Sequence, residues 1–402
     1  MFLISLAVFL LASGLGGLAS SGSLLIATRF VKGVAAAFTA PAGLSIITTT
    51  FEEGAARTKA LAAYTATGAT GFSLGLVFGG LMTEIGWRWV FFLPVPVALL
   101  TLLAGLELVP RDSRFIRGAR SFDVAGAVAL TAAMLLLVYT VVEAPDAGWG
   151  SLRTLGSFVA VGAILAGFVA VERRTAAPLV RLGILRSASL VQANLGAMML
   201  IGGWFGFQFI ATLYMQQLRG WSPLETGLAI FPGGFLVAVL APRIAPLVMR
   251  FGIRRLITAG LASTAAGYAL FLPIGLDSAY AAAMLPTFVL AGFGFALAYG
   301  PLNIAATNGV AAGEQGLASG LVSTSFQFGG ALVLAVVTAV NNAATGADGS
   351  QQGLLDGFHA AIVVSAIAAG LGVAATAARG RARTLPAPEL EVVEAEPEAE
   401  AA

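Results

Sequence analysis

The chain has 402 residues, of which 58% are hydrophobic and only 10% are charged, and its mean hydropathy is +0.90. A soluble domain of average composition has about 25% charged residues, so this chain has too few to cover a water-facing surface. It has no cysteine and one histidine, which excludes disulfide scaffolds, thiol catalysis and zinc–thiolate sites. The composition therefore indicates a membrane protein. Basic residues lie in short clusters between apolar runs, which argues against nucleic acid as a partner.

A helix needs about 20 largely apolar residues to cross a bilayer. Twelve segments have this length, and without an alternating strand pattern they are predicted to be helices. The first could also be a signal peptide, but it lacks a basic n-region. The predicted spans lie near residues 1–20, 23–48, 60–82, 88–109, 122–143, 154–172, 188–213, 224–249, 255–275, 279–300, 317–340 and 357–378.

The loop charges predict an orientation and a division of the chain. Seventeen of the 22 basic residues lie in one set of alternate loops, so the positive-inside rule predicts that both termini are cytoplasmic. Two strongly basic loops separate an isolated helix pair from four spans before it and six after it. The expected units are 1–110, 111–178, 179–378 and an acidic tail, 379–402, that is too polar to fold.

Glycines mark one helix face in the third span. Gly71, Gly75 and Gly79 recur every four residues and leave a strip without side chains. In lipid, such a strip lets a neighbouring backbone approach closely. We therefore expect this face to be buried against another helix, either as ordinary tight packing or as a moving interface.

Two cations lie inside the second span. Arg29 and Lys32 are three residues apart and lie on one helix face. Burying a cation at such depth costs about 2.5–3.5 kcal/mol, so a wet pathway or a partner is expected. The alternative is that both side chains snorkel to the outer headgroups or bind helix-end carbonyls. No carboxylate lies at mid-bilayer in the predicted spans.

Uncharged polar residues complete the candidates. Gln208, Tyr299 and Gln327 lie inside spans, where each side chain can hold a neighbouring helix or contact a substrate. No Ser/His, Cys/His or metal-ligand constellation is present, so we predict that the chain is not an enzyme and needs no cofactor or metal. A nonspecific channel is a further alternative, but the sequence shows no ring of like charges that would indicate one.

Several motifs together resemble the major facilitator superfamily, specifically its fourteen-span drug/proton antiporter branch, over residues 1–378. The motifs are Arg29-Phe-Val-Lys32-Gly33 followed by Pro41, the run Gly71 to Gly80, Trp87-Arg88-Trp89, Gln217 to Pro232, and Gly316 to Gly330. The resemblance implies an all-α polytopic bundle of about 12 helices, in two pseudo-repeated halves with a central linker helix pair. It also implies that Arg29 assists proton transfer and that Gly33, Gly71, Gly75, Gly79 and Gly80 form helix-packing surfaces.

The resemblance implies efflux of small amphipathic or drug-like molecules by alternating access, with protons as the coupling ion. The expected protein is a monomer or weak oligomer in the lipid bilayer of the inner membrane. Two departures qualify this expectation. The first two spans of that branch have no counterpart, and Leu76 stands where a proline is usual. The alternative is therefore an incomplete or mis-started family member without transport activity.

Overall fold

The structure is a computed structural model, and it describes residues 1–51, 55–109, 123–175, 180–308, 310, 314–346 and 350–377. Every regular element among these residues is a helix, and none is a strand. The main helices are α1 (Phe2–Gly17), α2 (Gly22–Thr50), α3 (Ala55–Ile85), α4 (Trp89–Phe92), α5 (Pro94–Leu108), α6 (Val124–Ala147), α7 (Leu152–Glu172), α8 (Ala188–Leu213), α9 (Pro223–Leu240), α10 (Ile244–Phe251), α11 (Ile253–Phe271), α12 (Leu285–Thr307), α13 (Gln315–Ala344) and α14 (Gln351–Ala377). Short η1 (Leu182–Arg186), η2 (Tyr214–Leu218), η3 (Ala241–Arg243) and η4 (Tyr280–Met284) connect them.

Each of the twelve predicted segments coincides with a helix or with two consecutive helices. Among the described residues, nine helices are long and apolar enough to cross a membrane. Three predicted spans are not among these nine: α1 is shorter, only Leu74–Ile85 of α3 counts as an apolar helix, and α11 carries Arg254 and Arg255 in its first turn. The all-α polytopic fold is therefore confirmed. The predicted basic loop between α5 and α6 and the acidic tail lie outside the described residues.

Serine and proline residues set where several helices begin. Ser222 caps α9 in a reciprocal pair with Glu225, and Pro223 occupies the first helical position. Ser21 and Ser187 accept hydrogen bonds from the first turns of α2 and α8. These side chains satisfy backbone N–H groups that would otherwise have no partner inside the helix.

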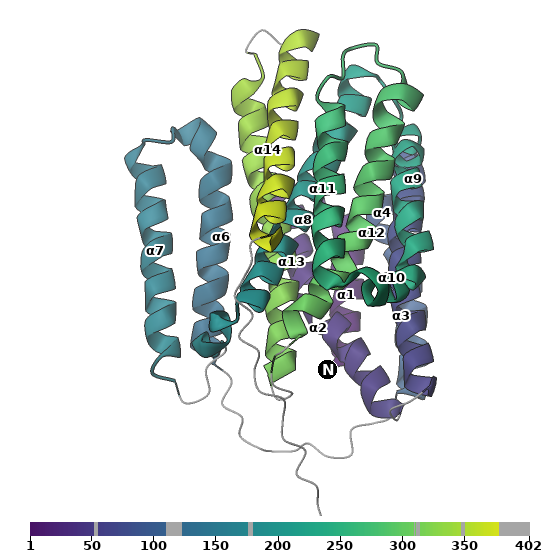
Figure 1. Cartoon of the computed structure of the whole chain (residues 1–402), viewed down its shortest axis with the longest axis vertical. Coiled ribbons are helices and arrows are strands. Elements are labelled where there is room, and N and C mark those ends of the chain that lie inside the picture. The colour runs from purple at the N-terminus through teal and green to yellow at the C-terminus, as the bar shows by residue number, and fades with distance from the viewer. Residues whose placement is uncertain are drawn as a thin grey trace, which may run out of the picture.

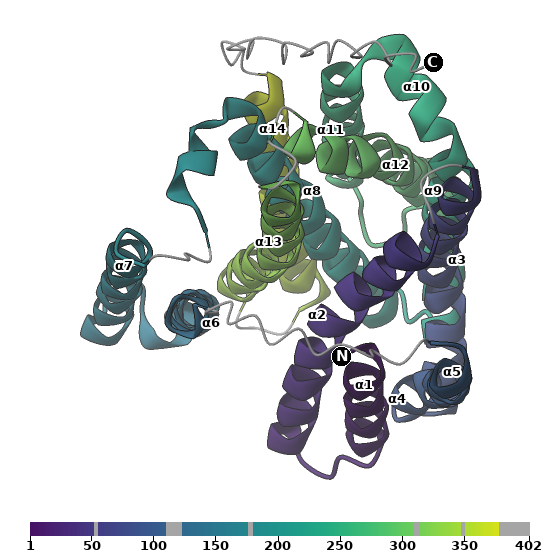
Figure 2. The same cartoon turned by 90° about the horizontal axis from the view of Figure 1, so that it is seen from below.

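Helix α8 is the centre of the C-terminal group of helices. It packs against α12, α13 and α14, and Figure 2 shows it between them. Aromatic rings fill the core around it: Phe207 stacks on Tyr268 at 4.6 Å and lies edge-on to Phe271 at 5.2 Å. This group, α8 to α14, forms a densely packed bundle.

The N-terminal group, α1 to α5, packs more loosely. Helix α1 lies beside α2 and contacts α4 and α5. The hydroxyl of Thr39 on α2 donates a hydrogen bond to Ser5 on α1 at 3.0 Å. At the other end of these helices, Arg88 donates to the carbonyl of Ala19 at 3.3 Å. A few polar contacts and ring contacts thus hold these helices together.

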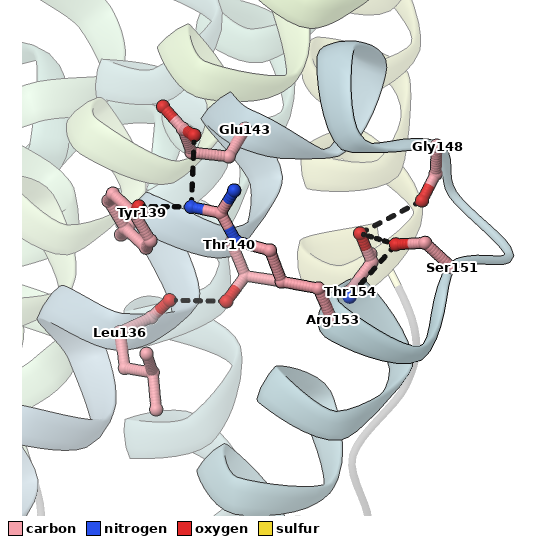
Figure 3. Close-up of polar contacts among 8 residues, drawn as sticks. All are labelled: Leu136, Tyr139, Thr140, Glu143, Gly148, Ser151, Arg153 and Thr154. Carbon is pink, nitrogen blue, oxygen red and sulfur yellow. Dashed lines mark hydrogen bonds and ion pairs between the residues drawn. The ribbon is translucent and has the colours of Figure 1, made fainter.

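Helices α6 and α7 stand to one side of both groups, and α6 contacts α13 (Figure 1). Figure 3 shows the turn that joins them. Arg153 donates to Tyr139 at 2.7 Å and to Glu143 at 3.3 Å, and Thr154 donates to the carbonyl of Gly148 at 2.9 Å. Gly148 takes a positive φ of 86°, which closes the turn without side-chain strain. The pair is therefore a well-defined helical hairpin.

Candidate functional site

The N-terminal and C-terminal groups meet where α3 lies beside α9 (Figure 2). A Cβ atom on Gly80 would lie 2.6 Å from the carbonyl oxygen of Pro223, and one on Gly227 would lie 2.7 Å from that of Leu76. Real Cβ contacts are essentially never so short, and both partners are backbone atoms. The two helices therefore approach closely because both positions are glycine. We call Leu76, Gly80, Pro223 and Gly227 the α3–α9 seam.

The other glycines of the predicted packing motif do not contact a neighbouring helix. A Cβ atom on Gly33, Gly71, Gly75 or Gly79 would meet no atom of another part of the structure within 4 Å. Gly71 and Gly75 are exposed, whereas Gly80 is buried. The expected burial of the strip Gly71, Gly75 and Gly79 is therefore wrong for this structure. The face that packs is one position further along the helix, because α9 reaches Leu76 and Gly80.

Arg29 and Lys32 lie within the N-terminal group and rest on aromatic rings. The guanidinium of Arg29 lies 5.1 Å from the ring centre of Phe91, and the Lys32 ammonium lies 4.8 Å from that of Phe9. The Lys32 ammonium is also 5.8 Å from Phe91. Among the described residues neither cation has a carboxylate within ion-pair distance. The negative faces of the rings thus replace an acidic partner.

In the C-terminal group, Tyr299 belongs to a row of aromatic rings. Its ring stacks between Phe295 at 5.3 Å and Phe326 at 4.9 Å, and Phe295 continues to Trp204 at 4.8 Å. Tyr299 is 43% exposed, so one part of the row is open to a binding partner. The row Trp204, Phe295, Tyr299 and Phe326 spans three helices, α8, α12 and α13. We call it the aromatic row.

The two glutamines lie next to this row. Gln208 on α8 lines a small cavity together with Trp204, Phe207, Ile230, Phe288 and Ala291. Gln327 follows Phe326 on α13 and is exposed. No described contact joins Arg29 or Lys32 to Gln208, Tyr299 or Gln327, so the structure does not bring the five predicted pathway residues together at one site.

Sequence reasoning missed the aromatic partners. Phe295 and Tyr299 are four residues apart and share a helix face, which is a readable signal. With 26 phenylalanines in the chain, however, this spacing recurs too often to single out a site. Phe9 and Phe91 carry no sequence signal for their contact with Lys32, because the two rings come from other helices, α1 and α4.

Carboxylates keep to the helix ends in the described part of the chain. Every described aspartate and glutamate lies in a connection or within about one and a half turns of a helix end, at roughly 3.6 residues per turn. This arrangement agrees with the sequence, which places no acid at mid-bilayer. The interior polar chemistry of the described spans therefore rests on cations, hydroxyls and amides.

Comparisons with known proteins give the family. Residues 1–334 match the family model described as Major Facilitator Superfamily. The chain is 37% identical over 354 residues to the puromycin resistance protein pur8 of Streptomyces alboniger, covering 86% of this chain and 69% of that protein. It is 33% identical over 338 residues to the tetracenomycin C resistance and export protein of Streptomyces glaucescens, covering 84% and 62%. The cephamycin export protein CmcT of Amycolatopsis lactamdurans is 35% identical over 347 residues, with 86% and 71% covered.

The chain therefore spans between 62% and 71% of the length of these three relatives. Two solved structures share the fold. A point mutant of the nucleoside transporter NupG has a TM-score of 0.59 at 11% identity, with 94% of this chain and 82% of that chain covered. The POT family transporter PepTSo has a TM-score of 0.58 at 16% identity, with 94% and 83% covered.

The named relatives are resistance and export proteins, which points to a transporter rather than an enzyme and does not favour an inactive family member. The family match covers most of the chain, and the helical fold agrees with it. By these matches the chain belongs to the major facilitator superfamily, a family of multi-pass membrane transporters, and its relatives are of the efflux type.

Proposed function

We propose that the chain exports small amphipathic, drug-like molecules by alternating access between the N-terminal and C-terminal groups. The observation that carries this proposal is the α3–α9 seam, where two helices from different groups touch through their backbones at Gly80 and Gly227. Because no side chain stands between the two helices at Gly80 and Gly227, they can slide or rock with little steric resistance. The relatives named for antibiotic resistance and export support the direction of transport.

The proposed substrate contacts come from both groups. Tyr299 would contact a substrate through the exposed edge of its ring and its hydroxyl, because both faces of the ring already stack on Phe295 and Phe326 while the residue is 43% exposed. Gln208 and Gln327 would supply hydrogen bonds that orient the molecule. Arg29 and Lys32 would give the N-terminal side of the pathway a positive potential. The units 1–110, 111–178, 179–378 and 379–402 remain the proposed division of the chain.

The proposed coupling ion is the proton, and both termini are proposed to be cytoplasmic. Export should then depend on an imposed pH gradient across proteoliposomes. Proteoliposomes that contain the protein should accumulate a fluorescent amphipathic substrate, and accumulation should stop when nigericin collapses the pH gradient. Accumulation that continues without the gradient would refute proton coupling but leave the export proposal in place.

The α3–α9 seam is tested by adding side chains. Gly80→Val and Gly227→Val should each abolish export, because the new methyl groups meet backbone atoms of the facing helix. Membrane insertion should persist, because both spans stay apolar. Gly75→Val is the matched control, since it adds the same side chain to α3 at a position that faces open space.

The measurements are efflux from whole cells and the amount of protein in purified membranes. Gly75→Val should transport at a rate within about twofold of the unmodified chain, in line with the small effect of surface substitutions. Normal efflux by both seam variants would refute the moving seam. Loss of efflux in the control as well would refute the assignment of the moving contact to the seam, because the effect would not be specific to Gly80 and Gly227.

A further inference from the structure

Helix α10 lies across one end of the bundle, between α9 and α11 (Figure 2). Its sequence, Ile-Ala-Pro-Leu-Val-Met-Arg-Phe, places Ile244, Leu247 and Val248 on one face. These side chains pack against Leu256 of α11 and Leu297 of α12. The helix is thus anchored to the bundle along one side only.

The rest of the helix surface combines exposed apolar side chains with a cation. Met249 is 88% exposed and Phe251 is 46% exposed, and Arg250 between them lies 5.2 Å from the ring centre of Phe251. Helices that lie in the headgroup region of a bilayer have this composition, with arginine on the polar side and large apolar residues pointing to the acyl chains. The exposed surface of α10 therefore fits the boundary between headgroups and hydrocarbon.

Arginines on both sides extend the positive charge. Arg243 directly precedes α10, and Arg254 and Arg255 lie in the first turn of α11, which begins at Ile253. Arg254 has a structural role, because it donates to the carbonyls of Thr376 and Ala377 and so caps α14.

The other cations lack such a role. Arg243 donates only to the end of the helix that precedes it, to the carbonyl of Val239 at 2.7 Å. Within the described ranges, Arg243, Arg250 and Arg255 are exposed and have no carboxylate partner. Three guanidinium groups around one amphipathic turn therefore remain available to an anion.

We propose that this surface, formed by Arg243, Met249, Arg250, Phe251 and Arg255, binds an anionic phospholipid. The arginines bind the phosphate-bearing headgroup, because guanidinium groups match phosphate oxygens in charge and geometry. Met249 and Phe251 lie among the upper parts of the acyl chains. The site is independent of the proposed export activity, because none of these residues belongs to the α3–α9 seam or to the aromatic row.

Native mass spectrometry of the full chain tests the site. The protein is purified in mixed micelles that contain equal amounts of phosphatidylglycerol and phosphatidylcholine, and the lipids retained on the monomer are counted. The unmodified chain should retain phosphatidylglycerol preferentially. Arg250→Gln with Arg255→Gln should lower this preference by about fivefold for each arginine removed. Arg250→Lys with Arg255→Lys should keep most of it, because the charge persists.

A control separates this site from general charge attraction. Arg173→Gln with Arg174→Gln also removes two exposed cations, at the end of α7 and on the same predicted side of the membrane. This variant should retain phosphatidylglycerol like the unmodified chain. Met249→Ser should lower retention while leaving every charge in place, which a purely electrostatic attraction would not do.

Several results would overturn the proposal. If the unmodified chain and the Arg250/Arg255 glutamine variant retain phosphatidylglycerol equally, these arginines do not form a lipid site. If the Arg173/Arg174 variant loses as much phosphatidylglycerol, the attraction is nonspecific. A change in the dimer fraction instead of lipid retention would assign the surface to a second copy of the chain. If the preference for phosphatidylglycerol emerges only after the six glutamates of residues 389–400 are changed to glutamine, the acidic segment and not a lipid occupies the arginine surface.

Discussion

The C-terminal and N-terminal groups differ in packing far more than in apolar content. The span Ala188–Leu218 is less apolar than Trp89–Leu108, yet 61% of its most apolar stretch is buried, against 17% for Trp89–Leu108. The hairpin helices α6 and α7 follow the second pattern, with hydropathy 2.2 and burial of 22% and 17%. Hydropathy in this protein therefore does not predict burial: Gln351–Ala377 is almost as apolar as Trp89–Leu108 with 39% of its most apolar stretch buried, and the least apolar span, Gly22–Thr39, has only 11% buried. The reason is that lipid tails are as apolar as a protein core, so apolar side chains gain little by leaving them.

The closeness of helix backbones explains the difference in packing between the two groups better than hydropathy does. In the C-terminal group, a Cβ atom on Gly202 would lie 2.7 Å from the carbonyl oxygen of Gly329, and one on Gly329 would lie 2.4 Å from the Met198 backbone. Within the N-terminal group, Gly33 and Gly75 face open space, and the tight glycines Gly16, Gly17 and Gly105 meet side chains and not backbone atoms. Dispersion and backbone contact hold membrane helices together, so glycines that meet backbone atoms mark the stable group.

Gly329→Val is expected to have the largest effect on this contrast. The new side chain meets backbone atoms of Met198, which cannot rotate away, so α8 and α13 must separate. We expect little or no monodisperse protein in detergent. Gly33→Val, in the loosely packed α2, should change the melting temperature by no more than about 2 °C. Equal losses for the two variants would show that the groups do not differ in packing.

Phe207→Ala should have the next largest effect. The ring is almost fully buried and contacts Tyr268 and Phe271, so its removal leaves a cavity that costs about 3–5 kcal/mol. Phe235→Ala removes the same ring from a side chain that is 54% exposed, and should cost less than about 1 kcal/mol. Chemical unfolding in detergent micelles gives both values. A similar cost for both rings would contradict the core assignment.

Phe91→Leu probes the N-terminal group. It removes the ring on which Arg29 and Lys32 rest, with a loss of about 0.5–2 kcal/mol. The Lys32 amine should then react faster with an acylating reagent, as followed by peptide mass analysis. Lys59, the only other lysine in the sequence, serves as the internal reference. An unchanged ratio of Lys32 to Lys59 labelling would show that the ring does not hold the ammonium.

Arg153→Gln should have the smallest effect. Arg153 and Glu143 are largely exposed, with side-chain exposures of 61% and 41%, and such pairs contribute at most about 1 kcal/mol. The hydrogen bonds of Ser151 and Thr154 remain and still close the turn between α6 and α7. A fall in melting temperature as large as that of Phe207→Ala would mean that this hairpin stabilises the bundle, contrary to its position at the side.

The sequence by itself determined the helical segments and the class of protein. Twelve apolar segments were predicted and all coincide with helices, because the length of a span and the charge of its flanks are local properties. The motif around Arg29, the run Gly71 to Gly80 and the motifs of the second half jointly indicated the superfamily, which the family match confirms. The placement of acids at helix ends was also readable directly from the residues.

The tertiary structure decided which residues meet. Gly75 and Gly80 are alike in sequence, and only the position of α9 makes Gly80 the close contact. Lys32 contacts Phe9, and Tyr299 contacts Phe326, because consecutive helices pack side by side, and the second ring near Lys32, Phe91, comes from α4. Hydropathy gives no information on which face of a span turns inward, since lipid and protein interiors are equally apolar. That choice depends on the fit between helices, and the fit exists only in three dimensions.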